Sequence, residues 1–112
     1  MSERFGIVWT DTARNDLLAI IDYLVDRDGV DAAEALYDKI VDAVRGLETM
    51  PRRCRIVPEL EAEGITAYRE LLVGPYRVMF AIRDATVVVL TALDSRRDLA
   101  ELLVERALRR DR

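Results

Sequence analysis

The chain has 112 residues and a formal net charge of −4, and 51% of its residues are hydrophobic. This length supports one ordinary hydrophobic core, so we expect a single domain over residues 1–112. The chain has no histidine and only one cysteine, Cys54, which excludes an internal disulfide, a Cys/His zinc site and a His-containing catalytic triad. We expect neither a metal ion nor another cofactor.

Hydropathy and charge bear on location and partners. No apolar run reaches the ~20 residues needed to cross a bilayer, and the N-terminus lacks the regions of a signal peptide, so we expect a cytoplasmic protein without a membrane partner. An acidic total disfavours general binding to nucleic-acid phosphates. Residues 1–50 hold five basic and eleven acidic groups, whereas residues 51–112 hold twelve basic and ten acidic groups. The second half can therefore still present a local basic patch.

The N-terminal region predicts a short strand followed by a helix. Hydrophobic residues alternate along Phe5–Trp9, which is typical of a strand, and Thr10 or Asp11 then offers a helix N-cap. The next apolar residues recur at helical spacing, and the pair Asp28–Gly29 ends the helix. The apolar stripe of this first helix comprises Ala13, Leu17, Ile20, Ile21 and Leu24.

A second helix follows after a link of a few residues. We expect Asp31 to cap this helix and Pro51 to stop it. Its apolar stripe comprises Ala33, Leu36, Tyr37, Ile40, Val41, Val44 and Leu47. Because the link is so short, the two helices should pack as an antiparallel hairpin.

The region after the second helix changes from irregular to β-rich. Residues 51–67 predict a loop with a turn of helix near Pro58–Glu63. Two short turns, Gly74–Pro75 and Asp84–Ala85, then separate three β-rich runs, which predicts an antiparallel meander. The three runs are Tyr68–Val73, Tyr76–Arg83 and Thr86–Asp94.

The middle run, Tyr76–Arg83, alternates between two faces. One face should pack on the helical hairpin, and the other, which carries Arg77 and Arg83, should be at least partly open. The run Thr86–Asp94 is apolar on both faces, so we expect it at the centre of the sheet and the first strand at an edge. Residues Arg97–Leu108 predict a C-terminal helix. The order is β-α-α-β-β-β-α, and the fold class is α+β with helices on one face of a sheet.

Three stretches carry a family resemblance when they are taken together. The first is the helix opening Thr12–Leu17, which runs on to Ile20 and Tyr23. The second is Tyr68–Phe80, with its Arg-Glu-Leu and Gly-x-Tyr-Arg-Val elements, and the third is Val89–Leu99, with Arg-Arg-Asp-Leu. Over about residues 5–103 the chain resembles the RelE/ParE superfamily of toxins from type II toxin–antitoxin systems.

The resemblance implies two alternative activities. RelE-like members cut messenger RNA on the ribosome without a metal ion, whereas ParE-like members inhibit DNA gyrase and are not known as nucleases. In both branches a cognate antitoxin neutralises the toxin by laying an extended or helical segment over its surface. The resemblance thus implies a toxin–antitoxin hetero-oligomer without a cofactor and without direct, specific binding of nucleic acid.

The nuclease activity would need particular side chains. RNA cleavage by 2′-hydroxyl attack requires a proton acceptor, a proton donor and positive charge near the phosphate. By the resemblance, Arg77 matches a family arginine, and basic residues near other family positions are Arg69, Arg96 and Arg97. Asp94 stands where many members have a histidine, and no Tyr or His follows it. A carboxylate base would need a raised pKa, which a neighbouring arginine opposes.

The ParE-like branch is therefore favoured. The Asp-Leu-x-x-Ile-x-x-Tyr pattern that begins at Asp16 looks like this branch, and inhibition by binding needs a complementary surface instead of a base. The alternatives are a RelE-like nuclease and a non-toxic homologue that only binds antitoxin. Candidate contacts with the target or the antitoxin are Arg69, Arg77, Arg83, Asp94, Arg96 and Arg97.

These candidates also have structural interpretations. Arg69 and Arg77 can pair with Glu70 or with other carboxylates, and Asp94 can cap the helix predicted after it. The cluster Arg52–Arg55, which contains three arginines, can bind acidic residues of an antitoxin or lie in a solvated loop.

Overall fold

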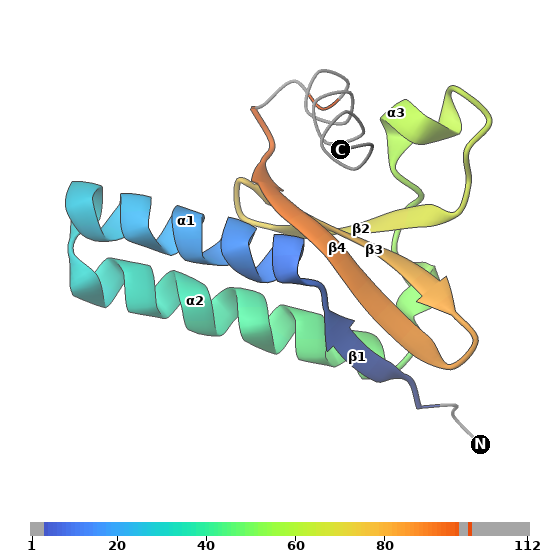
Figure 1. Cartoon of the computed structure of the whole chain (residues 1–112), viewed down its shortest axis with the longest axis horizontal. Helices are drawn as coiled ribbons and strands as arrows, with labels where there is room; N and C mark the ends of the chain where they lie inside the picture. The colour runs from blue at the N-terminus through green and yellow to red at the C-terminus, as the bar shows by residue number, and fades with distance from the viewer. Residues whose placement is uncertain (1–3, 97–98, 100–112) are drawn as a thin grey trace.

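The computed structural model describes residues 4–96 and Leu99, which form a four-stranded sheet with a long helical hairpin against it (Figure 1). The elements are β1 (Gly6–Trp9), α1 (Asp11–Asp28), α2 (Val30–Arg45), α3 (Pro58–Glu61), β2 (Tyr68–Val73), β3 (Tyr76–Arg83) and β4 (Thr86–Asp94). The predicted α+β class, the order of elements up to β4 and the ranges of the last three strands are confirmed. The predicted C-terminal helix lies outside the described residues, apart from Leu99.

The sheet has the strand order β1-β4-β3-β2. The last three strands form the predicted antiparallel meander. β1 pairs in parallel with β4, from Gly6 opposite Thr86 to Trp9 opposite Val89. β4 is therefore an internal strand and β1 an edge strand, and both predictions are confirmed.

Thr10 joins the start of α1 to the sheet. Its Oγ1 accepts a hydrogen bond from the backbone N–H of Ala13 at 3.1 Å, which is the predicted N-cap interaction. The same hydroxyl donates to the carbonyl oxygen of Val89 at 2.9 Å. The helix therefore begins at a fixed point beside β4, directly after β1 ends.

The second helix departs from the prediction at both ends. Gly29, at φ 97°, links α1 to α2 alone, so α2 begins at Val30 and Asp31 lies in its first turn without serving as the cap. α2 ends at Arg45, before Pro51, and continues as a 3-10 turn over Gly46–Glu48. This turn buries Leu47 in the core, and Met50, at φ 53°, then reverses the chain ahead of the proline.

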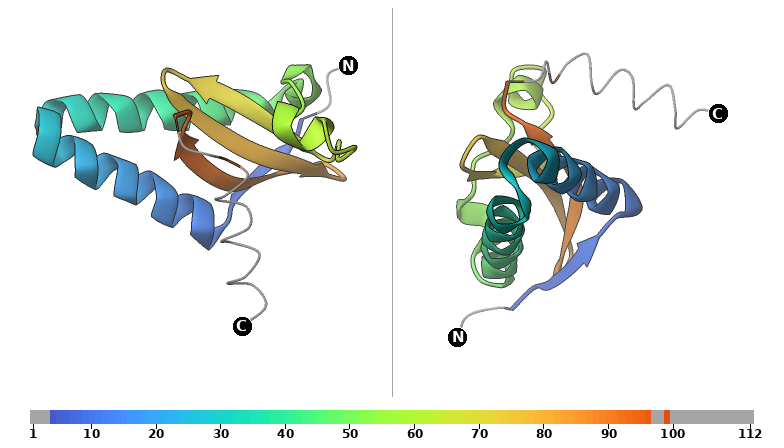
Figure 2. Two further views of the ribbon diagram at one scale, coloured as in Figure 1. Left: turned by 90° about the horizontal axis from the view of Figure 1, so that it is seen from above. Right: turned by 90° about the vertical axis from the view of Figure 1, so that its left-hand side faces the viewer.

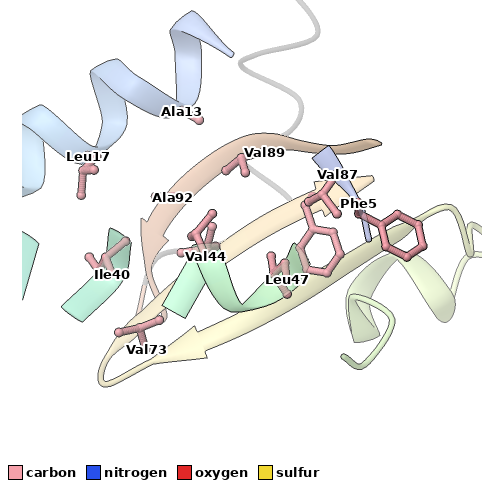
Figure 3. Packing of buried hydrophobic residues seen from close by; sticks show 12 residues of the cluster. Phe5, Ala13, Leu17, Ile40, Val44, Leu47, Val73, Val87, Val89 and Ala92 are labelled. Atoms are coloured by element: carbon pink, nitrogen blue, oxygen red, sulfur yellow. The ribbon is translucent and has the colours of Figure 1, made fainter. Parts of the chain in front are cut away.

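The main core lies between the helical hairpin and one face of the sheet (Figures 2 and 3). Three residues of the predicted stripe of α1 are buried, and Ile20 and Ile21 of the same stripe are half-buried against the core. The buried members of this cluster are Phe5, Ala13, Leu17, Ile40, Val44, Leu47, Val73, Val78, Phe80, Val87, Val89 and Ala92.

The other face of the sheet is more closed than the alternation of β3 predicts. Arg83 is exposed there as expected, but Arg77 and Met79 are buried. A second cluster covers this face, in which Val57 and Leu99 pack with Met79 and Leu93. The face that the sequence predicts to be at least partly open is thus open at Arg83 and closed along most of β3, because the segment around α3 lies over it and supplies apolar contacts and carboxylates.

Candidate functional site

Four charged side chains meet on the second face of the sheet, beside α3. Glu70 of β2 and Arg77 of β3 are diagonal neighbours, because Glu70 pairs with Met79 and Leu72 pairs with Arg77 across the two strands. Glu59 reaches the same place from α3, and Arg55 reaches it from the segment before α3. We refer to these four residues as the charge network.

Backbone pairing places Arg55 in the network. Ile56 forms an isolated antiparallel bridge with Arg69 of β2. The N–H of Val57 donates to the carbonyl of Tyr68 at 2.9 Å, and the N–H of Glu70 donates to the carbonyl of Arg55 at 3.0 Å. The segment before α3 thus runs along the edge of β2, and this alignment brings Arg55 to Glu70.

Every member of the charge network has a charged partner. Arg77 donates through Nε to Glu70 Oε1 at 2.6 Å and through its two terminal nitrogens to the two oxygens of Glu59 at 2.7 Å each. Arg55 donates through Nε to Glu70 Oε2 at 2.5 Å. Glu70 is fully buried and the side chain of Arg77 is 7% exposed, whereas the side chain of Glu59 is 44% exposed. Two arginines thus balance two carboxylates.

The contact between Arg77 and Glu59 favours the charged forms of these two groups. The hydrogen bonds from Arg77 lower the pKa of Glu59 to about 2, although desolvation acts in the opposite direction. The same contact with Glu59 raises the pKa of Arg77 above its ordinary value. Glu59 is therefore an ionised hydrogen-bond acceptor at neutral pH, and its low pKa makes it a weak general base.

A pocket of about 300 Å³ opens beside the network. Its lining residues are Arg55, Pro58, Glu59, Leu72, Gly74, Arg77 and Ser95. The guanidinium and carboxylate groups that face this pocket are bonded to one another, so the pocket presents a compensated ion-pair network in place of a free cationic surface.

The structure separates the arginines that the sequence analysis grouped. Arg69 pairs across the strands with Phe80, a core residue, so it lies on the helix-facing side of the sheet, opposite to Arg77. Its Nη1 donates to the carbonyl of Cys54 at 2.6 Å. Arg83 is exposed at the far end of β3, six residues and about 20 Å of extended strand from Arg77. These three arginines do not form one site.

Asp94 and Arg96 form a local pair at the end of β4. The carboxylate of Asp94 accepts from the backbone N–H of Arg96 at 2.8 Å and from its guanidinium Nε at 2.9 Å. This bond is the main reason that the pKa of Arg96 is raised. The predicted cap of a following helix remains a prediction for Asp94, and Arg97 lies outside the described residues.

Asp16 is the first residue of the Asp-Leu-x-x-Ile-x-x-Tyr pattern in α1, and its side chain forms hydrogen bonds with β4. Its Oδ2 accepts from the Thr91 hydroxyl at 2.5 Å and from the Ala92 N–H at 3.1 Å. The register of β3 and β4 shifts at this point, because Met79 pairs with Thr91 but Phe80 pairs with Val89, which leaves one extra residue in β4. Asp16 therefore supplies hydrogen bonds to a β-bulge beyond the end of β1.

Sequence reasoning missed Glu59 as a partner of Arg77. Glu59 lies in an acidic stretch of the irregular region, where nothing local distinguishes it. Glu70 offers a better signal, because a glutamate at a buried position of a strand needs a cationic partner. Of the arginine cluster before α3, Arg55 joins the network, whereas Arg52 lies over the ring of Phe5 at 5.4 Å.

Residues 4–96 and Leu99 offer neither a cluster of metal ligands nor a membrane-spanning helix. In that part of the chain, no three side chains of Cys, Asp or Glu gather as possible metal ligands. The helices described there include none with the length and apolar character needed to cross a membrane.

The family model that matches the chain describes the ParE toxin of the type II toxin–antitoxin system parDE, and the match covers residues 7–99. The chain is also similar in structure to a chain of the chromosomal ParDE toxin–antitoxin system from P. aeruginosa. That match has a TM-score of 0.69 and 23% identity, and it covers 83% of this chain and 98% of that chain. At this identity, the similarity supports the fold alone.

A second solved structure is the toxin–antitoxin complex RelBE2 from Mycobacterium tuberculosis. The chain matches it with a TM-score of 0.56 and 25% identity, covering 81% of this chain and 91% of that chain. No curated protein sequence matches the chain.

Proposed function

Because the chain belongs to the ParE toxin family of type II toxin–antitoxin systems, we propose that it is the toxin of such a system and inhibits DNA gyrase by binding to it. A cognate antitoxin neutralises it in a hetero-oligomeric complex, in the cytoplasm. The antitoxin partner is supported by the family match and by the similarity to RelBE2, which is a toxin–antitoxin complex.

The observation that favours binding over RNA cleavage is the position of Arg77. By the sequence resemblance, Arg77 corresponds to an arginine of the nuclease branch, where positive charge must reach a phosphate. Here its guanidinium is 7% exposed and bonded to both Glu70 and Glu59. A phosphate would have to displace a carboxylate from a compensated network, at a substantial cost in desolvation and lost hydrogen bonds.

The acid–base properties of the site also favour inhibition by binding over RNA cleavage. A general base works best when its pKa lies near the working pH. Glu59 has a pKa of about 2, far below that range, and the chain has no histidine. Inhibition by binding requires complementary surface only, and it makes no demand on these groups.

The test is DNA supercoiling by purified gyrase with increasing amounts of the chain. We expect a dose-dependent loss of supercoiling or an accumulation of cleaved DNA, and reversal when the protein encoded by the adjacent antitoxin reading frame is added. Circular dichroism of the same preparation verifies that the chain is folded. A folded chain that leaves gyrase unaffected would contradict the proposal.

Two further assays then identify the alternative. Cleavage of messenger RNA on programmed ribosomes would indicate the RelE-like activity, which the similarity to RelBE2 keeps as a second candidate. If neither gyrase nor messenger RNA is affected and induction leaves growth unchanged, the chain is a homologue that only binds antitoxin.

A further inference from the structure

Three arginines lie together where the chain passes from the hairpin to the sheet. Arg52 and Arg53 belong to the 3-10 turn Pro51–Arg53, and Arg69 belongs to β2. Nη1 of Arg69 donates to the carbonyl of Cys54 at 2.6 Å, which ties the turn to the start of β2. Burial raises the pKa of Cys54, and the charges of Arg53 and Arg69 both oppose that rise, so both guanidinium groups lie near the same thiol. We call the three arginines the arginine patch.

Backbone hydrogen bonds hold the patch in place. The N–H of Arg53 donates to the carbonyl of Met50 at 3.2 Å. The N–H of Phe5 donates to the carbonyl of Glu48 at 2.9 Å, so the segment ahead of the turn lies beside the start of β1. The guanidinium of Arg52 stacks over the Phe5 ring at 5.4 Å, which leaves the N–H groups on its edge available to a ligand. A patch fixed in this way loses little conformational entropy when it binds.

Strand register places the patch at one end of the sheet. Gly6 of β1 pairs with Thr86 of β4, and Arg83 of β3 pairs with the same threonine, so β1 and β4 begin where β3 ends. Tyr68, the first residue of β2, pairs with Ala81 near that end. Figures 1 and 2 show the start of β1 and the α1–α2 link at opposite ends of the molecule. The patch is therefore distant from the acidic residues around that link.

Nearby carboxylates do not cancel the charge of the patch. In the part of the chain that the structure describes, none of its three arginines forms an ion pair. Glu48 lies close by, but it pairs with Arg4 at 3.6 Å. Asp84 follows Arg83 directly in the turn after β3, so this arginine offsets its charge. The glutamates of α3 belong to the other face of the sheet, away from Arg69. Three positive charges thus remain together.

The patch offers charge and hydrogen-bond donors but little apolar surface. Phe5 and Leu47 beside it are buried and Cys54 is half-buried, whereas Met50 is 65% exposed. The centre of a protein interface is usually apolar and aromatic, and one methionine provides little of that. Phosphates need only charge and donors, and the planar guanidinium matches two phosphate oxygens at once. These properties favour a nucleic-acid backbone over an acidic protein.

We propose that the arginine patch binds the phosphate backbone of duplex DNA without reading the base sequence. The duplex is the favoured nucleic acid because its phosphates are the most densely spaced, which suits three guanidinium groups around one turn. The net charge of −4 confines the contact to this end of the molecule and makes it weak and strongly dependent on salt. This inference goes beyond the proposed function, because the contact needs neither gyrase nor an antitoxin.

The probe is a fluorescent DNA duplex of about 20 base pairs and mixed sequence, titrated with the full chain and followed by fluorescence anisotropy. Three phosphate contacts predict that the dissociation constant rises about 40-fold between about 50 mM and 200 mM salt. A duplex of unrelated sequence should bind equally well. A single strand of the same length should bind more weakly, because its phosphates are farther apart.

Protein variants locate the contact. The patch variant, Arg52→Gln with Arg53→Gln, should weaken binding at least about tenfold at low salt and reduce the salt slope by about 2. The charge-retaining variant, Arg52→Lys with Arg53→Lys, should keep most of that slope. The control, Arg14→Gln with Arg27→Gln, removes the same charge from α1, where both arginines are exposed and paired with aspartates. It should change binding less than about threefold.

Loss of folding is a separate explanation for weak binding by the patch variant, because Arg52 covers the ring of Phe5. Circular dichroism verifies the fold of each variant. Arg53→Gln alone keeps the Arg52 contact, and it should still reduce the salt slope by about 1.

Four results would overturn the proposal. The first is no binding of the duplex at low salt, and the second is a folded patch variant that binds as tightly as the parent. The third is a control that weakens binding as much as the patch variant, since that would show a general effect of net charge. The fourth is a glutamate-rich peptide of about 18 residues that binds at least as tightly as the duplex, which would assign the patch to an acidic protein.

Discussion

Arg77 and Glu59 form a bidentate ion pair that holds α3 against the sheet, with Nη1 and Nη2 of Arg77 each 2.7 Å from an oxygen of Glu59. The third bond of the same guanidinium goes to Glu70, whose side chain is fully buried. An arginine that resembles a catalytic group in the sequence therefore stabilises the second face of the sheet.

Substitution Arg77→Ala should lower the free energy of unfolding by about 1.5–3 kcal/mol, because it removes one of the two arginines that pair with the buried carboxylate of Glu70, together with the partner of Glu59. Urea unfolding at pH 7 measures the change. Arg96→Ala is the matched control, since the side chain of this arginine is 76% exposed. Its effect should stay within about 0.5 kcal/mol.

The double variant Arg77→Met with Glu70→Met distinguishes buried charge from lost packing. If the loss in Arg77→Ala comes from the reduced charge compensation of the buried carboxylate of Glu70, replacing both charges with apolar side chains should recover much of the stability. A double variant as unstable as Arg77→Ala would show that packing around the guanidinium dominates.

Under the proposed function, folded Arg77→Ala protein should still inhibit gyrase.

The bond to Glu59 predicts a specific dependence of stability on pH. The pKa of Glu59 is lowered from 4.5 to about 2, so its stabilising contribution is fully present above pH 4.5 and is lost as the pH falls toward 2. Solvent screening reduces its size, because the side chain is 44% exposed. Urea unfolding of the parent and of Glu59→Gln should differ at pH 7 and converge near pH 2. A difference that persists there would contradict this assignment.

Asp16 should contribute to stability through the β-bulge. Asp16→Ala removes the acceptor for the Thr91 hydroxyl and the Ala92 N–H, both of which lie on buried residues of β4. We expect a loss of about 1–3 kcal/mol in the free energy of unfolding. Asp22→Ala in the same helix is the control, because Asp22 is exposed, and it should change stability little. Faster hydrogen exchange at Ala92 would locate the effect at the bulge.

The strands could be predicted from the sequence because their limits depend on local chemistry. Turn-forming pairs such as Gly74–Pro75 separate β2 from β3, and alternation along β3 sets its two faces. The closure of the second face depends on contacts between distant residues, such as Arg77 with Glu59, which are 18 positions apart. No periodicity encodes such a pair, so the alternation of β3 predicts a face that is at least partly open and does not show how much of it is covered.

The site residues were harder to predict for the same reason. Alternation along β3 places Arg77 correctly on the side away from the helices, but it cannot show that carboxylates cover this side. Arg69 and Arg77 look alike in sequence, yet cross-strand pairing puts them on opposite faces of the sheet. The family resemblance, in contrast, extends over nearly the whole chain and did not depend on these contacts.

Two glycines of the helical hairpin should respond to alanine with opposite signs. Gly29 links α1 to α2 at φ 97°, a conformation that strains any L-residue with a side chain, although space for a Cβ is open. We expect Gly29→Ala to cost about 1–2 kcal/mol. Gly46 has φ −60° and ψ −18°, and its Cβ would also meet open space. There alanine restricts the unfolded chain without strain, so Gly46→Ala should stabilise by about 0.4–1 kcal/mol.

Thermal and urea unfolding measure the stability of the two glycine variants. Neither added methyl group meets a neighbour within 4 Å, so new side-chain contacts do not affect the comparison. Any difference between the variants must then come from backbone conformation at the two positions. If Gly29→Ala were neutral, the α1–α2 link would have to adopt another conformation, and α2 would gain room for the Asp31 cap that the sequence predicts. The response of Gly29 thus tests whether the link between the helices is a single left-handed residue.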